Sequence, residues 1–228
     1  MRAELEGDEL LLLQPVLLQS RQRLGVIAYV DAKAAIRFIR ANGGKYLLDS
    51  TNIVVWGASS GGHIVEMLAS TNNLPAYEDL TMGNPTSSSA VQGVVAWYAV
   101  ADVSSLSETG TAFADKIMGY DVRKYKAKTH NANPLELVTR NFPPILLVHG
   151  TNDQVVPCKQ SIDIQKKINA ATAKNTAKLI IFKGASHGDG VIKTNKSVAI
   201  DLYFVDKILY SGHNPYRNTN YVDIRVLE

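Results

Sequence analysis

Val54-Val55-Trp56-Gly57-Ala58-Ser59-Ser60-Gly61-Gly62-His63 is the stretch that decides the fold of this 228-residue chain. An apolar run meets a Gly-x-Ser-x-Gly motif, which predicts a buried strand that turns sharply into a helix with Ser59 at the corner. A side chain at either motif glycine is expected to collide with the neighbouring strand or helix. The motif alone is also typical of an ordinary glycine-rich turn, so the downstream residues decide between the two interpretations.

Two later segments each place a chemically active side chain just after an apolar strand. Asp153 follows the strand that ends at His149, and His187 lies in a glycine-flanked loop after a strand over residues 178–183. Open α/β sheets gather catalytic groups at the carboxyl ends of their strands, and the order serine, acid, histidine is the one this architecture requires. Singly, Asp153 also fits a turn and His187 a solvated loop. Together with Ser59 they predict a catalytic triad.

The rest of the chain alternates predicted helices and strands. Residues 29–42 predict an amphipathic helix that ends at Gly43-Gly44 as a left-handed stop. Its apolar face carries Ala32, Ala35, Ile36 and Ile39, and its basic face, expected to be solvated, carries Lys33, Arg37 and Arg40. The helix of residues 60–70 follows the serine corner, and a strand is predicted over residues 91–98.

Two further helices are predicted in the second half of the chain. One turns Ile164 and Ile168 inward, and the last turns Val198, Leu202, Val205 and Leu209 toward the core. Strands separated by helices imply a mostly parallel sheet flanked by helices. Residues 99–142 have no long periodic pattern and many turn formers, so we expect a small insertion over the sheet edge within one α/β domain spanning residues 1–228.

Composition excludes several classes of partner. The net charge of +3 is small, and neither a basic stripe nor a stacking motif suggests nucleic acid. Cys158 is the single cysteine, which excludes an intrachain disulfide. The apolar run of residues 10–18 is broken by Gln14 and Pro15, and acidic residues precede it, whereas a signal peptide begins with basic residues. The chain as given is therefore expected to be cytoplasmic and without a membrane partner, with secretion left open should a further N-terminal segment exist.

Several other residues are candidates for metal binding or for lining the substrate pocket. His63 and Glu66 are too few to hold a metal, so packing is expected there, and His149, at a strand end, is expected to be a hydrogen-bonded structural residue. Neither a metal nor an organic cofactor is implied. Trp97 and Tyr98 close a strand near the predicted site, where lining an acyl pocket and packing in the core are equally good interpretations.

Residues 24–211 resemble the α/β-hydrolase esterases of the acetyl-esterase and bifunctional feruloyl/acetyl-xylan-esterase type, which are related to hormone-sensitive lipases. The residues that carry the resemblance are 31–42, Trp56–His63, Trp97-Tyr98, Pro143–Pro157 and Gly184–Gly188. The resemblance implies an α/β-hydrolase fold and a small-molecule ester substrate, with short acyl groups on alcohols or sugars. It assigns Ser59 as nucleophile, Asp153 as acid and His187 as base. The backbone N–H of Ser60, at the start of the helix that follows Ser59, is expected to bind the oxyanion with the help of the helix dipole.

The chain departs from that family before the serine corner. Family members carry additional first strands and a His-Gly-Gly loop that supplies half of the oxyanion hole, and residues 1–58 contain no such loop. We therefore expect a domain without its first strands, with residues 9–20 as a remnant strand. Two alternatives stay open: a serine peptidase of the prolyl-oligopeptidase kind, which usually has tyrosine where this chain has Ser60, and a catalytically weak or dead hydrolase fold that serves in binding.

Overall fold

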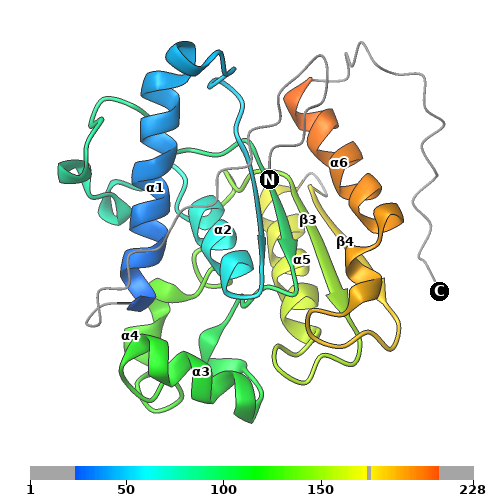
Figure 1. The fold of residues 1–228 in the computed structure, drawn as a ribbon. Coiled ribbons are helices and arrows are strands. Elements are labelled where there is room, and N and C mark those ends of the chain that lie inside the picture. Colours follow the sequence, from blue (N-terminus) through cyan, green and yellow to red (C-terminus); the bar gives the residue numbers. More distant parts are fainter. Residues whose placement is uncertain (1–23, 174–175, 211–228) are drawn as a thin grey trace.

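A parallel four-stranded sheet forms the centre of the protein (Figure 1), in a computed structural model that describes residues 24–173 and 176–210. Its strands are β1 (Val54–Ala58), β2 (Gly93–Trp97), β3 (Ile145–Gly150) and β4 (Ala177–Phe182), hydrogen-bonded in that order. Every neighbouring pair is parallel. The predicted parallel α/β sheet is confirmed, and the carboxyl ends of its strands all meet at one edge.

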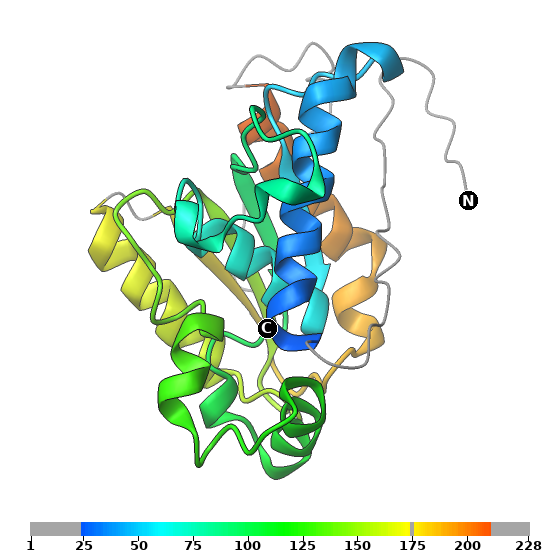
Figure 2. The same cartoon turned by 90° about the vertical axis from the view of Figure 1, so that its left-hand side faces the viewer.

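Helices cover both faces of this sheet. On one side lie α1 (Leu24–Asn42), α2 (Ser60–Ser70) and α5 (Lys159–Thr172), and on the other lies α6 (Asn195–Leu209), as Figures 1 and 2 show from two directions. Side chains alternate along β2, so Val94 and Ala96 pack with the first group and Val95 and Trp97 with α6. This alternation follows from the two-residue period of a strand.

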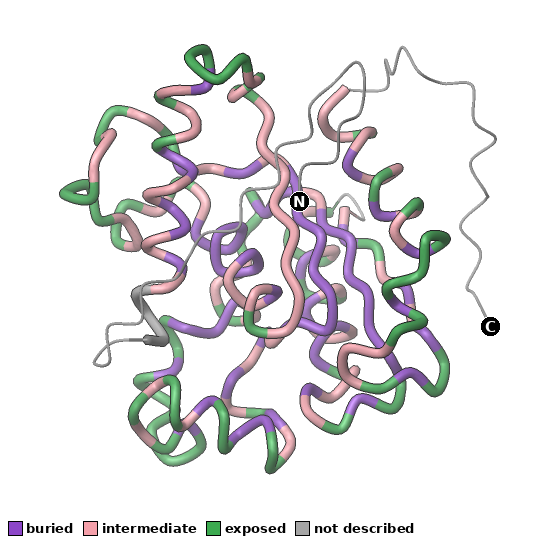
Figure 3. Tube along the Cα trace, in the orientation of Figure 1, coloured by how far each residue is buried: buried purple, intermediate pink, exposed green. Residues whose placement is uncertain are grey.

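Burial differs between the central strands and β1. Every residue of β2 and β3 is buried, whereas every residue of β1 is of intermediate exposure (Figure 3). Parallel strands covered on both faces read as continuous apolar runs, which explains why β2 and β3 stand out in the sequence. Among the described strands, β1 lies at one edge, and Ser59 follows directly from it.

The segment between β2 and β3 contains helices that the sequence pattern did not predict. They are α3 (Glu108–Met118) and α4 (Lys126–Thr129), at the end of the molecule toward which the strand arrows point in Figure 1. Ser107 caps α3 by accepting a hydrogen bond from the Gly110 N–H, and Gly119 ends the helix at a φ of 73°. Serine is a preferred residue just before a helix and glycine just after one, so these two caps could have been used to predict α3 from the sequence.

The basic face of α1 is not solvated, which corrects the sequence prediction. Lys33 and Arg37 are 0% and 1% exposed. The Lys33 Nζ donates to Glu78 Oε1 at 2.9 Å, and the Arg37 Nη1 donates to Glu78 Oε2 at 2.6 Å. Arg40 is partly buried and donates to four backbone carbonyls. Burying charged groups is costly unless they are paired, and Glu78 provides that pairing from the loop after α2.

Two smaller predictions are also wrong. The Gly43-Gly44 pair does not end α1 in a left-handed turn, because both residues belong to a 3-10 helix, Gly43–Tyr46, and the left-handed residue is Leu47 at a φ of 57°. Leu202 does not face the core and is 38% exposed, whereas its neighbour Asp201 is fully buried. Asp201 accepts a hydrogen bond from the Trp97 indole, while Val198, Val205 and Leu209 of α6 pack against the core as predicted.

Two sequence expectations concern the ends of the chain. The remnant strand expected over residues 9–20 lies outside the described residues. Within residues 24–173 and 176–210, none of the helices has the length and apolar character needed to cross a bilayer.

Candidate active site

Ser59 occupies a strained corner between β1 and α2. Its backbone lies at φ 54° and ψ −118°, and its N–H donates to the Trp97 carbonyl at 2.9 Å. A Cβ at Gly57 would approach the Gly61 carbonyl oxygen to 2.2 Å, so glycine is required there. A Cβ at Gly61 would meet nothing within 4 Å. The expected collision is therefore confirmed for Gly57 and wrong for Gly61.

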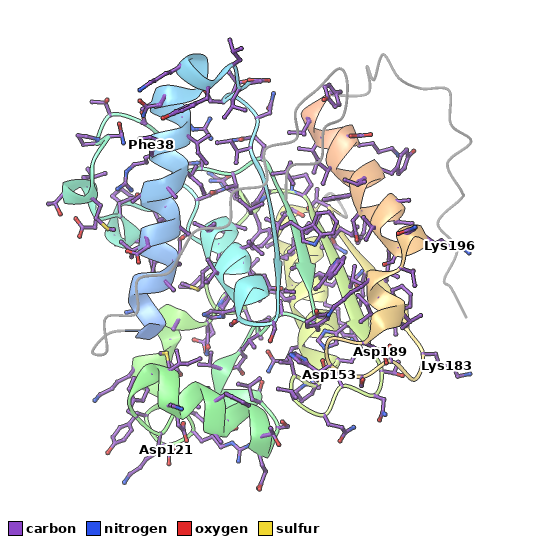
Figure 4. All side chains as sticks on the ribbon, in the orientation of Figure 1. Phe38, Asp121, Asp153, Lys183, Asp189 and Lys196 are labelled. Carbon is purple, nitrogen blue, oxygen red and sulfur yellow. The ribbon has the colours of Figure 1, made fainter. Side chains whose placement is uncertain are left out.

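The structure joins the three predicted catalytic residues by hydrogen bonds. The Ser59 Oγ lies 2.8 Å from His187 Nε2, and His187 Nδ1 lies 2.7 Å from Asp153 Oδ2. Asp153 follows β3 and His187 follows β4, at the edge of the sheet where the strands end; Figure 4 labels Asp153 there. With the proton on His187 Nδ1, Nε2 accepts from the serine hydroxyl. This arrangement can take a proton from Ser59 as its oxygen attacks an electrophile.

Asp153 is held rigidly and stays ionised. Its carboxylate is 0% exposed, and Oδ1 accepts hydrogen bonds from the Val155 and Val156 N–H groups at 2.9 and 2.8 Å. Burial alone raises the pKa of this carboxyl, but hydrogen bonds with His149, His187 and the two amides outweigh it and hold the pKa well below its usual range. An ionised carboxylate next to His187 favours the imidazolium that forms when His187 accepts a proton.

The loop that carries His187 is braced by local contacts. Asp189 accepts hydrogen bonds from the N–H groups of Ser186 and Val191, at 3.2 and 3.1 Å. Gly184 and Gly188 adopt φ angles of 77° and 71°, which favour glycine. His187 itself is 21% exposed, so its ring remains accessible from solvent.

The two predicted pocket residues lie in different environments. Trp97 is 9% exposed, donates its indole N–H to Asp201 at 3.2 Å and packs edge-on against Trp56, so it is a core residue. Tyr98 is 5% exposed, and its ring centroid lies 4.8 Å from that of His187 in an edge-to-face arrangement. Tyr98 therefore lies at the site, as expected for a residue that closes a strand near it, although its contact with His187 was not itself predicted.

Ser60 is exposed and is the first residue of α2. The first N–H groups of a helix have no carbonyl one turn back within the helix, so the Ser60 N–H is available to an oxyanion beside Ser59. The aligned peptide dipoles of α2 place partial positive charge at this end. The helix start can therefore supply one oxyanion donor.

Two buried carboxyl groups, Glu66 on α2 and Asp201 on α6, have raised pKa values. Burial raises the pKa of Glu66 to about 8 and that of Asp201 to about 7. Both Glu66 oxygens lack a hydrogen-bond partner among the described residues, and His63 instead donates to the Val100 carbonyl at 2.8 Å. In the part of the chain that the structure describes, no group of three ligating side chains forms a metal site.

The BD-FAE family model matches residues 24–168, which is more than half of the chain. The chain belongs to the BD-FAE family. The matched region begins with α1 and includes β1, the serine corner, β2, β3 and Asp153.

Individual relatives are esterases by name. The chain is 32% identical over 162 residues to Esterase LipC of Mycobacterium tuberculosis, an alignment that covers 70% of this chain and 40% of LipC. A truncated carbohydrate esterase from gut microbiota superposes with a TM-score of 0.71 at 28% identity, covering 78% of this chain and 67% of that one. A bifunctional GH43-CE protein of Bacteroides eggerthii superposes with a TM-score of 0.70 at 30% identity, covering 78% and 24%. The α/β-hydrolase fold is thereby confirmed, and the chain spans less than half the length of the curated relatives it matches.

Proposed function

We propose that the protein is a serine carboxylesterase that hydrolyses short-chain acyl esters through an acyl-enzyme. The observation that carries the proposal is the continuous hydrogen-bonded series Ser59–His187–Asp153 at the carboxyl ends of β1, β3 and β4. Its membership of a family whose named relatives include esterases supports the same conclusion.

The reaction follows from the positions of the three side chains. The Ser59 Oγ attacks the ester carbonyl carbon while His187 Nε2 takes the hydroxyl proton. Asp153 holds the His187 tautomer with Nδ1 protonated and stabilises the imidazolium. The tetrahedral oxyanion is bound by the Ser60 N–H. His187 then gives its proton to the departing alcohol. A water molecule, deprotonated by His187, attacks the acyl-Ser59 carbonyl carbon, and His187 returns the proton to the Ser59 Oγ as the carboxylic acid leaves.

We propose a small acyl group on an alcohol or sugar as the substrate class. The names of two structural relatives at 28% and 30% identity, a carbohydrate esterase and a GH43-CE protein, support the sugar side of this proposal. The buried Tyr98 ring packs edge-on against the His187 ring and limits the space for an acyl group on that side of the site. The segment between β2 and β3 is a modest insertion that offers a long acyl chain little apolar wall, so the gain of about 0.8 kcal/mol per buried methylene would be small, and acetyl to butyryl esters should be preferred over palmitate.

Fluorophosphonate labelling with mass-spectrometric mapping tests the assignment directly. We expect the label on Ser59, and we expect Ser59→Ala to lose both labelling and p-nitrophenyl acetate hydrolysis while its thermal melt stays nearly unchanged. Wild-type turnover in Ser59→Ala would refute the nucleophile, and kcat/KM rising from butyrate to palmitate would refute the short-chain preference.

One observation favours a slower catalyst as the second candidate. Residues 1–58 contain no His-Gly-Gly loop to supply a second oxyanion donor. Loss of one such donor typically lowers kcat by about 10²–10³. We therefore expect a protein made of these 228 residues alone to be labelled slowly at Ser59. Labelling and turnover as fast as in a relative that carries the His-Gly-Gly loop would refute this candidate.

A further inference from the structure

His149 is a fully buried histidine that lies directly behind the active-site carboxylate. It is the fifth residue of β3 and is 0% exposed. Its Nε2 lies 2.9 Å from the Val156 carbonyl oxygen and 3.3 Å from Asp153 Oδ2. Its Nδ1 lies 2.7 Å from the Ser161 Oγ on α5. Both ring nitrogens therefore have polar neighbours, although no solvent reaches the ring.

These neighbours determine which nitrogen carries the proton. The two groups next to Nε2 are a carbonyl oxygen and a carboxylate oxygen, which only accept hydrogen bonds. Nε2 must therefore be protonated, because an unprotonated nitrogen there would face two acceptors. The Ser161 hydroxyl can donate to Nδ1, which leaves a neutral imidazole with every polar atom satisfied. Ser161 thus fixes the His149 tautomer from the side of α5.

In this tautomer His149 constrains both oxygens of Asp153. Its N–H donates to the Val156 carbonyl, and the Val156 N–H donates to Asp153 Oδ1 at 2.8 Å, so His149 closes the turn that holds Oδ1. The protonated edge of the same ring lies against Oδ2, the oxygen that accepts from His187. A displacement of His149 would therefore move both the turn and the carboxylate.

We propose that His149 is a positioning residue that fixes the Asp153 carboxylate and thereby orients His187 toward Ser59. The proposal rests on the hydrolase function above, since its consequence for turnover needs that reaction. Its structural consequence, a fixed hydrogen bond between Asp153 and His187, exists whether or not the protein turns over an ester.

Three variants separate positioning from general support of the fold. His149→Leu keeps a buried side chain and removes the N–H. His149→Gln can place an amide N–H near the position of Nε2, so it is the conservative variant. Ile168→Val is the stability control, because Ile168 is 0% exposed and lies two turns further along α5 than Ser161. The kcat is normalised to the number of Ser59 residues that a fluorophosphonate labels.

We expect His149→Leu to lower the normalised kcat on the order of 10–100-fold with KM nearly unchanged, because small displacements of catalytic groups have effects of that size. His149→Gln should recover most of this loss, and Ile168→Val should lower the melting temperature without changing the normalised kcat. Unchanged kcat in His149→Leu, or a loss that His149→Gln does not recover, would overturn the proposal.

The low-field proton NMR spectrum provides a readout that does not depend on turnover. We expect a resonance from the proton between Asp153 and His187, identified by its loss in Asp153→Asn. It should persist in Ile168→Val and His149→Gln, and broaden or shift in His149→Leu. A wild type without this resonance, or a His149→Leu spectrum identical to the wild type, would overturn the positioning role. A wild type that shows the resonance but hydrolyses no ester would refute the proposed function and leave the role of His149 supported.

Discussion

Glu66→Gln is the substitution whose effect on stability can be worked out most directly from the structure. Glu66 lies on α2, is 0% exposed, and has no hydrogen-bond partner for either oxygen among the described residues. Burial raises its pKa from 4.5 to about 8. The folded protein therefore keeps this carboxyl protonated at neutral pH, whereas the unfolded chain ionises it.

The sign and size of the effect follow from proton linkage. Between pH 4.5 and about 8 the folded state binds one more proton at Glu66 than the unfolded state does. The contribution of Glu66 to the free energy of unfolding therefore falls by about 1.4 kcal/mol per pH unit across that window. Glutamine cannot ionise, so the variant loses this slope. The advantage of Glu66→Gln should grow by about 2.5 kcal/mol from pH 5.5 to pH 7.5.

Urea unfolding of both proteins at several pH values between 5 and 8 measures this difference. All other titrating groups are shared, so they cancel when the two free energies are subtracted at each pH. Glu108→Gln is the matched control, since it removes an exposed carboxylate from the first turn of α3. A difference between wild type and Glu66→Gln that stays constant with pH would refute the reasoning, because it would mean that Glu66 is solvated or paired.

Three further predictions concern the site and the charges beside it. Gly57→Ala should lower the free energy of unfolding by about 1–3 kcal/mol, because its Cβ would approach the Gly61 carbonyl oxygen to 2.2 Å. Gly61→Ala should be tolerated, because its Cβ would meet nothing within 4 Å. Thermal melts that show equal losses of stability in the two variants would contradict this. Glu78→Gln should cost roughly 3 kcal/mol in urea unfolding, because it leaves two buried cations of α1 without their anion; an unchanged midpoint would count against the pairing. The Ser59→Ala/His187→Ala double variant should hydrolyse p-nitrophenyl acetate hardly more slowly than either single variant, because the residues act as one unit; multiplicative losses would speak against a shared mechanism.

The sequence was most informative where a local pattern and a motif coincide. The apolar runs of β2 and β3 are buried on both faces, so their position could be predicted from composition alone. Ser59, Asp153 and His187 could be selected because each follows a strand and their order fits one architecture. Residues that follow parallel strands lie at the same edge of the sheet, so the meeting of these three side chains could be predicted once the strands were known to be parallel.

The sequence failed where a partner lies far along the chain. Lys33 and Arg37 have the spacing of a solvated helix face, and only the distant Glu78 makes their burial possible. Leu202 was expected to face the core, whereas the buried residue is its neighbour Asp201, which accepts a hydrogen bond from the distant Trp97. Periodicity reports which side chains share a face of a helix, and it does not report which face a long-range polar contact will select.

The order of the strands in the sheet explains how four strands suffice to position the catalytic residues. The strands that position Ser59 and Asp153, β1 and β3, are both neighbours of β2, and His187 follows β4 on the far side of β3. Tyr98 follows β2, and its ring lies against His187 in the middle of this arrangement. Its N–H donates to the Val148 carbonyl at 2.7 Å, so the residue that supports His187 is itself fixed to β3. The relative positions of all three polar side chains are thus set by hydrogen bonds within four adjacent strands and the loops that leave them.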